Sequence, residues 1–410
     1  MKKYLLLMFV NLFLITCNPK AQSGWIQSSG NFTYDLKCAV MPDSQYFICA
    51  GEGNKILISS DGGNIWQEVT TDFYNMIDID FINSSTGYLL NEYFIIKTTN
   101  KGFNWTYIDA GPYTKTNVDF INELTGFVSG TDVGDQSPVA YVNRTTNGGV
   151  NWNHYQMYDI GISRNVKFFN QDTGVAFVCN RIHYSTNGGV NWSQRPYIIE
   201  CFNSLSSFSF NSHISFGFSG KIYKTNNCGV SWIEQLSGTT KNIYNSFFTD
   251  SSTGYAVGDS GLILRTSNGG INWTIQNSNT TKKLFDVYFT DHTTGIIAGE
   301  DGTILTTTTG GLTFLNSNSE FIPEGYYLSQ NYPNPFNPVT EIEFGIPDLE
   351  FVTLKVYDAL GKEVRTIVNE NLSQGNFKAE FDGSDLPSGI FYYKLEAGDN
   401  VLTRKMLLLK

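Results

Sequence analysis

Residues 145–152 read TTNGGVNW and residues 185–192 read STNGGVNW. This box, Ser/Thr-x-Asp/Asn-x-Gly-x-x-aromatic, occurs in seven places. Its copies are SSDGGNIW (59–66), TTNKGFNW (98–105), TTNGGVNW (145–152), STNGGVNW (185–192), TNNCGVSW (225–232), TSNGGINW (266–273) and TTTGGLTF (307–314), the last with Thr309 where Asp or Asn is expected. Successive final aromatics are 39, 47, 40, 40, 41 and 41 residues apart. A near-constant period of this length indicates a repeat architecture.

Each period has room for four short strands. A strand with a basic end precedes several boxes, and an earlier alternating strand ends at a phenylalanine. The basic ends are Lys97, Arg144, Lys224 and Arg265, and the strand-ending aromatics are Phe81, Phe120, Phe168, Phe210, Phe248 and Phe289. Four strands in about 40 residues make one propeller blade, which cannot bury its faces without neighbours. We therefore predict an all-β chain with a seven-bladed β-propeller over residues 22–318; a linear solenoid is the alternative.

A further tryptophan lies on the same grid ahead of the first box. Trp25 precedes Trp66 by 41 residues. We expect the strand around Trp25 to close the ring by joining the outer edge of the last blade near Phe314.

The boxes resemble the Asp-box, or BNR, repeats of sialidases and related propellers. The longer stretch TGYAVGDSGLILRTSNGGINW at residues 253–273 is similar to the photosystem II assembly-factor family of seven-bladed propellers. The resemblance covers residues from about 25 to 316. It implies the propeller fold and no single function, because one fold supports many.

The box residues are suited to tightening a hairpin. An Asn or Asp side chain can accept turn N–H groups, and glycine adopts positive φ without steric cost. The tryptophan can wedge against the adjacent sheet. We assign a structural role, in preference to calcium or substrate binding, to Asp61, Asn100, Asn147, Asn187, Asn227, Asn268, Trp66, Trp105, Trp152, Trp192, Trp232 and Trp273.

The first strand of each blade is expected to line the central channel. Polar residues recur one and three positions before the strand-ending phenylalanine: Asp78 and Asp80, Asn117 and Asp119, Asn165 and Lys167, Ser207 and Ser209, Asn245, and Asp286. Candidate ligand-binding residues are Asp78, Asp80, Asp119, Lys167 and Asp286. They predict either a hydrated channel that needs a polar lining or a site for a cation, sugar or peptide.

A sialidase-like enzyme would need three convergent arginines to grip a carboxylate, together with acidic catalytic groups. The propeller region has five arginines, and Arg144 and Arg265 occupy the basic position of the repeat. Nucleophile-elbow, zinc-protease and phosphate-loop motifs are missing from the sequence. We therefore expect a non-catalytic protein without catalytic residues, cofactor or metal site, with a glycan-active hydrolase as the alternative. The net charge of −11 argues against nucleic-acid binding.

Residues 2–16, KKYLLLMFVNLFLIT, combine a charged start with an apolar stretch too short for a stable membrane span. We interpret residues 1–21 as a signal peptide, cleaved at Ala21-Gln22, and expect no transmembrane span afterwards. A lipobox-like LITC ending at Cys17 is the competing processing route.

Five cysteines remain after cleavage, an odd number that excludes complete pairing within one chain. Cys38 and Cys49 flank the turn MPDSQ, and a hairpin there would place them opposite each other. A disulfide is chemically permitted after export, and two buried thiols are the alternative.

The pattern changes after Phe314. Residues 319–326 are expected to form a linker, and alternating segments in residues 327–410 predict a small Ig-like antiparallel β-sandwich. This segment resembles the C-terminal sorting domain of the type IX secretion system of Gram-negative bacteria. The resemblance rests on NYPNPFNP (331–338), VYD (356–358), LGK (360–362), LPSG (386–389) and KMLLLK (405–410).

The resemblance implies passage through the outer membrane, removal of the tag, and release or attachment at the cell surface. An adhesive Ig-like module is the alternative. We therefore predict a secreted or cell-surface recognition or scaffold protein. Its expected partners are the type IX machinery, through residues 327–410, and an unidentified extracellular glycan or protein.

Overall fold

The computed structural model describes residues 24–311 and 323–409, apart from positions 29, 109, 112, 134–137, 180, 197–201, 373, 384 and 385. The predicted signal peptide with Cys17, as well as Cys201, Phe314 and residues 319–322 of the predicted linker, lie outside the described residues. No helix within the described ranges is long and apolar enough to cross a membrane.

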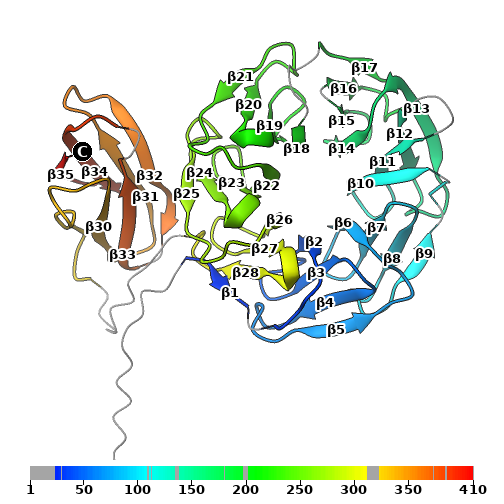
Figure 1. Ribbon diagram of the computed structural model, residues 1–410, viewed down its shortest axis with the longest axis horizontal. Helices are drawn as coiled ribbons and strands as arrows, with labels where there is room; N and C mark the ends of the chain where they lie inside the picture. Colours follow the sequence, from blue (N-terminus) through cyan, green and yellow to red (C-terminus); the bar gives the residue numbers. More distant parts are fainter. Residues whose placement is uncertain are drawn as a thin grey trace, which may run out of the picture.

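Seven four-stranded antiparallel sheets among the described residues surround a central axis (Figure 1). In chain order, blade 1 is β2 (Leu36–Val40), β3 (Phe47–Gly51), β4 (Lys55–Ser59) and β5 (Gln67–Thr70); blade 2 is β6 (Met76–Phe81), β7 (Gly87–Asn91), β8 (Ile95–Thr98) and β9 (Thr106–Ile108); blade 3 is β10 (Thr114–Phe120), β11 (Gly126–Asp132), β12 (Val139–Thr145) and β13 (Asn153–Ile160); blade 4 is β14 (Ser163–Phe168), β15 (Gly174–Val178), β16 (Arg181–Ser185) and β17 (Ser193–Gln194). Blade 5 is β18 (Phe202–Ser207), β19 (His213–Gly217), β20 (Ile222–Thr225) and β21 (Ile233–Gln235); blade 6 is β22 (Ile243–Phe248), β23 (Gly254–Gly258), β24 (Ile263–Thr266) and β25 (Thr274–Gln276); blade 7 is β26 (Leu284–Phe289), β27 (Gly295–Gly299), β28 (Ile304–Thr307) and β1 (Ile26–Gln27). Short 3-10 turns follow the second strand in blades 5 to 7, at η1 (Phe218–Gly220), η2 (Asp259–Gly261) and η3 (Glu300–Gly302). The predicted seven-bladed propeller is confirmed.

The ring closes by pairing the two ends of the propeller segment. Strand β1 pairs with β28, with Ile26 opposite Thr306, so the first strand in the chain completes the last blade. Trp25 is 1% exposed and packs edge-on against Phe289, with ring centroids 5.8 Å apart. The box tryptophan Trp152 packs in the same way against the inner strand of its own blade. The expectation that the strand around Trp25 joins the last blade is therefore confirmed.

In blades 1 to 6 the box forms the turn between the third and fourth strands, whereas the fourth strand of blade 7, β1, comes from the start of the chain. In blade 3, the Thr145 hydroxyl accepts the Gly149 N–H at 2.9 Å, and Asn147 Oδ1 accepts the Asn151 N–H at 2.9 Å. Gly149 has φ of +90°, a conformation that favours glycine. Equivalent acceptor bonds are made by Asp61, Asn100, Asn187, Asn227 and Asn268. These bonds give a geometric basis to the turn-tightening role predicted for the box.

A second set of hydrogen bonds links the boxes of blades 2 to 7 to the preceding blade. The carbonyl of the fourth box residue is the acceptor, and in three of the six pairs the donor is the basic residue near the end of the third strand. The pairs are Tyr46 to Lys101, Lys97 to Gly148, Arg144 to Gly188, Arg195 to Cys228, Lys224 to Gly269 and Gln276 to Gly310. Six seams between blades are therefore bonded on their outer side.

Cys38 and Cys49 do not meet in the structure, so the disulfide hypothesis is corrected. Both are free thiols among the described cysteines. Cys38 lies opposite Ala50 and Cys49 lies opposite Ala39, an offset of one residue. Because successive side chains of a strand point to opposite faces, the two thiols enter different cores. Burial raises the pKa of both.

The C-terminal segment forms two antiparallel sheets with a shared apolar core. One contains β29 (Tyr327–Leu328), β30 (Val339–Ile346) and β33 (Gly375–Asp382); the other contains β32 (Glu363–Leu372), β31 (Glu350–Tyr357), β34 (Gly389–Ala397) and β35 (Asn400–Leu408). Asn331 is 2% exposed, and its amide donates to the Thr340 hydroxyl at 2.9 Å and to the Pro333 carbonyl at 3.0 Å. These bonds anchor the proline-rich stretch to the sandwich.

Candidate functional site

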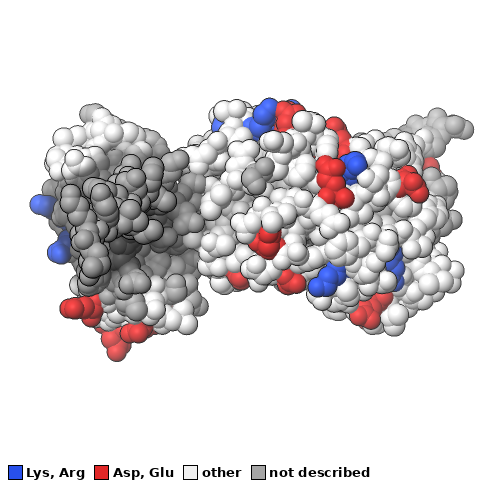
Figure 2. Space-filling model, turned by 90° about the horizontal axis from the view of Figure 1, so that it is seen from below, with Lys and Arg blue, Asp and Glu red and all other residues white. Residues whose placement is uncertain are grey.

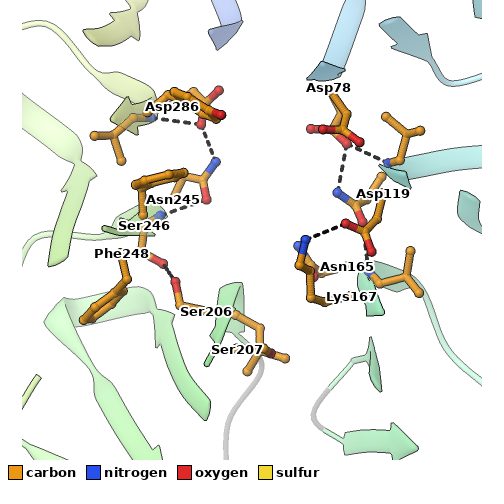
Figure 3. Close-up of a pocket in the computed structure, with 18 of the residues that line it drawn as sticks. Asp78, Asp119, Asn165, Lys167, Ser206, Ser207, Asn245, Ser246, Phe248 and Asp286 are labelled. Carbon is orange, nitrogen blue, oxygen red and sulfur yellow. Dashed lines mark hydrogen bonds and ion pairs between the residues drawn. The ribbon is translucent and has the colours of Figure 1, made fainter. Parts of the chain in front are cut away.

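A cavity of about 540 Å³ lies at the propeller channel and is lined by the first strands of all seven blades. Figure 3 shows its walls, with Asp78, Asp119 and Lys167 on one side and Asp286 and Asn245 on the other. The five predicted ligand-binding residues, Asp78, Asp80, Asp119, Lys167 and Asp286, all contribute to this lining. The structure therefore brings the predicted set together.

A β-bulge near the start of each inner strand re-aims the side chain that follows it. The register shifts lie at Leu36/Cys38, Met76/Asp78, Lys115/Asn117, Ser163/Asn165, Phe202/Ser204, Ile243/Asn245 and Leu284/Asp286. After its bulge, Asp78 accepts the Val118 N–H of blade 3 at 2.7 Å. The side chain thus joins neighbouring blades as well as facing the channel.

Asp286 makes the same kind of bond where blade 7 meets blade 1. Its Oδ2 accepts the Ala39 N–H at 2.7 Å, and its Oδ1 accepts the Asn245 amide at 2.6 Å and the Val287 N–H at 2.9 Å. Three donors fix this carboxylate.

The next inward-facing row holds the other charged candidates. Asp80 accepts the Phe120 N–H at 2.7 Å, and Asp119 accepts the Phe168 N–H at 2.7 Å. Lys167 pairs with Asp119 at 2.6 Å while its side chain stays 49% exposed. Lys167 is therefore the candidate most available to a ligand, whereas the carboxylates are partly used to hold blades together.

Burial raises the pKa values of the cavity carboxylates Asp78, Asp80 and Asp286. Burial raises the pKa of Asp286 to about 7 and, with the negative charge of Asp119, that of Asp80 to about 6. Burial also raises the pKa of Asp78, and Asp286 adds to the effect. The charge of Asp119 raises the pKa of Lys167. The channel therefore carries partly protonated acids close to neutral pH.

Blade 5 differs from the alignment predicted from sequence. Strand β18 ends at Ser207, three residues before Phe210, so Ser207 and Ser209 are not the predicted channel pair. Ser204 and Ser206 occupy those positions instead, and Ser206 bonds to Ser246 of blade 6 at 2.8 Å. Phe210 looked like a strand end because it repeats the phenylalanine spacing, but it lies in the following turn.

Comparisons with known proteins agree with this architecture. Residues 330–409 match the family model "Secretion system C-terminal sorting domain". The solved structure "YCF48 bound to D1 peptide" is 18% identical, with a TM-score of 0.57, covering 72% of this chain and 96% of its own. YCF48 from Cyanidioschyzon merolae is 17% identical, with a TM-score of 0.57, covering 70% of this chain and 99% of its own. No curated protein matches the chain.

The chain is a β-propeller with a C-terminal secretion sorting domain. A third solved structure, the "WD40 beta propeller domain of Doa1", is 10% identical with a TM-score of 0.56 and covers 69% of this chain and 96% of its own. At these identities the solved structures show the fold alone. The sorting domain indicates a secreted or cell-surface protein.

Four of the five propeller arginines bond to the framework, and the fifth, Arg164, is exposed. Arg144 and Arg195 donate to box carbonyls of the next blade, and Arg265 Nε donates to the Tyr255 hydroxyl at 3.3 Å. Arg181 donates to Gln194 in the same blade. Among the described residues that line the cavity there is no arginine.

Sequence reasoning missed a serine–histidine pair in the propeller. In five blades the inner strand ends in a phenylalanine opposite a glycine, as in Phe248 and Gly254. In blade 5 the corresponding pair is Ser207 and His213. The Ser207 hydroxyl lies 2.9 Å from His213 Nδ1, and Ser207 is one of the residues that line the cavity (Figure 3). A correct alignment of SFSFNSH with its neighbours would have revealed this exchange.

The seam between blades 4 and 5 also differs from its neighbours. Asn117 Oδ1 bonds blade 3 to blade 4 through the Val166 N–H at 2.9 Å. The equivalent Asn165 has no hydrogen bond to blade 5, and within the described part of the chain none joins β14 to β18. The cavity lining continues across this seam from Lys167 to Ser207.

Proposed function

We propose that this protein is an exported recognition or scaffold propeller that binds its ligand in the channel cavity. The observation that carries this proposal is the lining of the cavity. Box and seam residues repeat from blade to blade and hold the ring together, whereas the cavity residues differ between blades. A concave site with a few convergent polar groups is the usual place for a ligand.

The chemistry of the lining favours a polar ligand with a cationic or multiply hydroxylated group. Carboxylates come from blades 2, 3, 6 and 7, and hydroxyl or amide groups come from blades 3 to 7. Phe247 and Tyr288 add an aromatic pair with ring centroids 4.7 Å apart. Glycans and peptides both offer groups that such a surface recognises. The neighbour bound to the D1 peptide makes a peptide ligand compatible with this fold.

Nothing in the cavity favours the sialidase-like alternative. That chemistry needs arginines around the substrate carboxylate. Four of the propeller arginines bond the framework instead, and the described residues that line the cavity include no arginine, so we propose binding without hydrolysis of glycans.

The sorting domain supports the proposal that this protein is exported. We infer that residues 327–410 engage the type IX secretion machinery of a Gram-negative cell and that the propeller then acts outside the outer membrane. Lys or Arg and Asp or Glu side chains are interspersed on the face shown in Figure 2.

The test is a glycan and surface-protein binding screen on the exported chain, repeated with cavity variants. Asp80→Asn keeps an oxygen for the Phe120 N–H but removes the charge, and Lys167→Gln removes the exposed ammonium. Each is expected to weaken binding by about tenfold, the scale of one charged hydrogen bond. Lys224→Gln, which alters an outer seam, is the control. Unchanged affinity in both cavity variants, or binding by residues 327–410 alone, would refute the proposal.

A further inference from the structure

We propose that Ser207 is an activated nucleophile, with His213 as its general base, that accepts the acyl group of an activated carboxylic ester held in the channel cavity. This goes beyond ligand binding. It depends on the cavity but not on the identity of the proposed ligand.

The first support is the exchange of a repeated pair. A Cβ built on Gly254 would lie 2.3 Å from the Phe248 ring, so the phenylalanine position requires glycine on the neighbouring strand. Blade 5 has the reverse arrangement, with a small side chain on the inner strand and an imidazole on the second. If Ser207 and His213 only filled the space of the phenylalanine–glycine pair, a hydroxyl aligned with a ring nitrogen would not be required.

The second support is the hydrogen-bond geometry of the imidazole. His213 Nε2 lies 3.1 Å from the Phe210 carbonyl, which can only accept, so Nε2 carries the proton. Nδ1 is then the unprotonated nitrogen, and the Ser207 hydroxyl donates to it at 2.9 Å. The backbone carbonyl thus fixes the tautomer that serves as a base. This nucleophile, base and orienting group form the arrangement expected for covalent catalysis.

The third support is the contrast in exposure within the pair. His213 is 0% exposed, whereas Ser207 is partly exposed and lines the cavity. Burial lowers the pKa of His213 to about 4, which keeps the imidazole neutral near neutral pH. A base this weak favours reaction with activated esters over unactivated ones.

The cavity gives a substrate a way to reach Ser207, because Ser207 is one of the residues that line it. The described residues of β14 make no hydrogen bond to β18, and Lys167 faces the cavity on the blade 4 side. The cavity volume lies within the range of small-molecule sites.

The chemical step balances without a redox partner. Ser207 Oγ forms a bond to the acyl carbon while the ester bond from that carbon to the alcohol oxygen breaks. The Ser207 proton passes to His213 Nδ1 and then to the departing alkoxide. The products are acyl-Ser207 and a free alcohol, and water can later release the carboxylic acid and restore the hydroxyl.

The test uses p-nitrophenyl acetate with the full exported chain. We expect a stoichiometric burst of nitrophenolate and, by peptide mapping, acetylation at Ser207 ahead of other serines. Ser207→Ala should abolish the burst. Loss of the base in His213→Gln should slow acetylation of Ser207 by about 100-fold.

Two matched variants separate chemistry from folding. Ser209→Ala removes a nearby exposed hydroxyl that is not among the residues lining the cavity, and should leave the burst intact. The double variant Ser207→Phe with His213→Gly restores the pair of the other blades and should keep the thermal midpoint while losing the burst. Acetylation of Ser207 no faster than of Ser206, or an unchanged rate in His213→Gln, would overturn the proposal. Because the readout is covalent, its failure is distinguishable from failure of the binding screen.

Discussion

Replacing Trp25 with alanine should open the propeller at its closing blade. The Trp25 side chain is 1% exposed, packs edge-on against Phe289, and donates from its indole N–H to Gln276 at 2.9 Å. Truncating a buried tryptophan to alanine costs about 3–5 kcal/mol. Leaving the Gln276 oxygen without its donor adds about 1 kcal/mol. We therefore expect the free energy of unfolding of the propeller to fall by about 4–6 kcal/mol.

Differential scanning calorimetry of the exported chain provides the measurement. In a domain of this size, 1 kcal/mol corresponds to about 2–4 °C, so the propeller midpoint should fall by roughly 8–24 °C. Trp25→Phe is the matched control: it keeps an aromatic ring against Phe289 and loses the hydrogen bond, and should cost about 1–3 kcal/mol. A shift below about 2 °C for the alanine variant would refute the idea that this residue closes the ring.

Three further changes test other parts of the molecule. Asp286 has a raised pKa of about 7, so the folded state binds more protons than the unfolded state between about pH 4 and 7. Its contribution makes the free energy of unfolding fall with rising pH in that window, by at most about 4 kcal/mol, and urea titrations should show a flatter profile for Asp286→Asn. Gly254→Ala would place a Cβ 2.3 Å from Phe248 and should cost about 1–3 kcal/mol in urea unfolding, whereas Gly389→Ala, with no atom within 4 Å of its added Cβ, should change little. Deleting residues 327–410 should leave the propeller in the periplasm on cell fractionation; undiminished surface delivery would contradict the sorting role.

The fold could be predicted because its signals are local. The Asn147 turn, the positive φ of Gly149 and the bond from the Trp152 indole N–H to the Gly149 carbonyl all lie within one eight-residue box, and the chain repeats that box at a nearly fixed interval. Because the same turn-forming box recurs at a nearly fixed interval, it can be recognised in a single sequence without knowledge of contacts between distant residues. The role of Trp25 was predictable for the same reason, since it lies 41 residues before Trp66, at the spacing of the repeat.

The candidate site was less predictable because it depends on register. Phe210 has the spacing of a strand-ending phenylalanine, although strand β18 ends three residues earlier, at Ser207. An alignment on Phe210 therefore misses the pairing of Ser207 with His213. An offset of one residue likewise sends Cys38 and Cys49 into different cores. The bulges that turn Asp78 toward the next blade leave no clear mark on the residue pattern. Direction within a strand is decided by such single-residue shifts, which periodicity does not resolve.

The hydrogen bonds at the outer seams affect how the number of blades can change. Each blade from the first to the sixth supplies a donor to the next box carbonyl, and the bonds all run in the same direction around the ring. A unit of about 40 residues therefore carries a hydrogen-bond donor for the seam with the next blade and an acceptor carbonyl for the seam with the preceding blade. Gene duplication of such a unit would copy donor and acceptor at once, so the number of blades can change without the invention of a new interface. The cavity residues, which these bonds do not use, remain free to diverge in each copy.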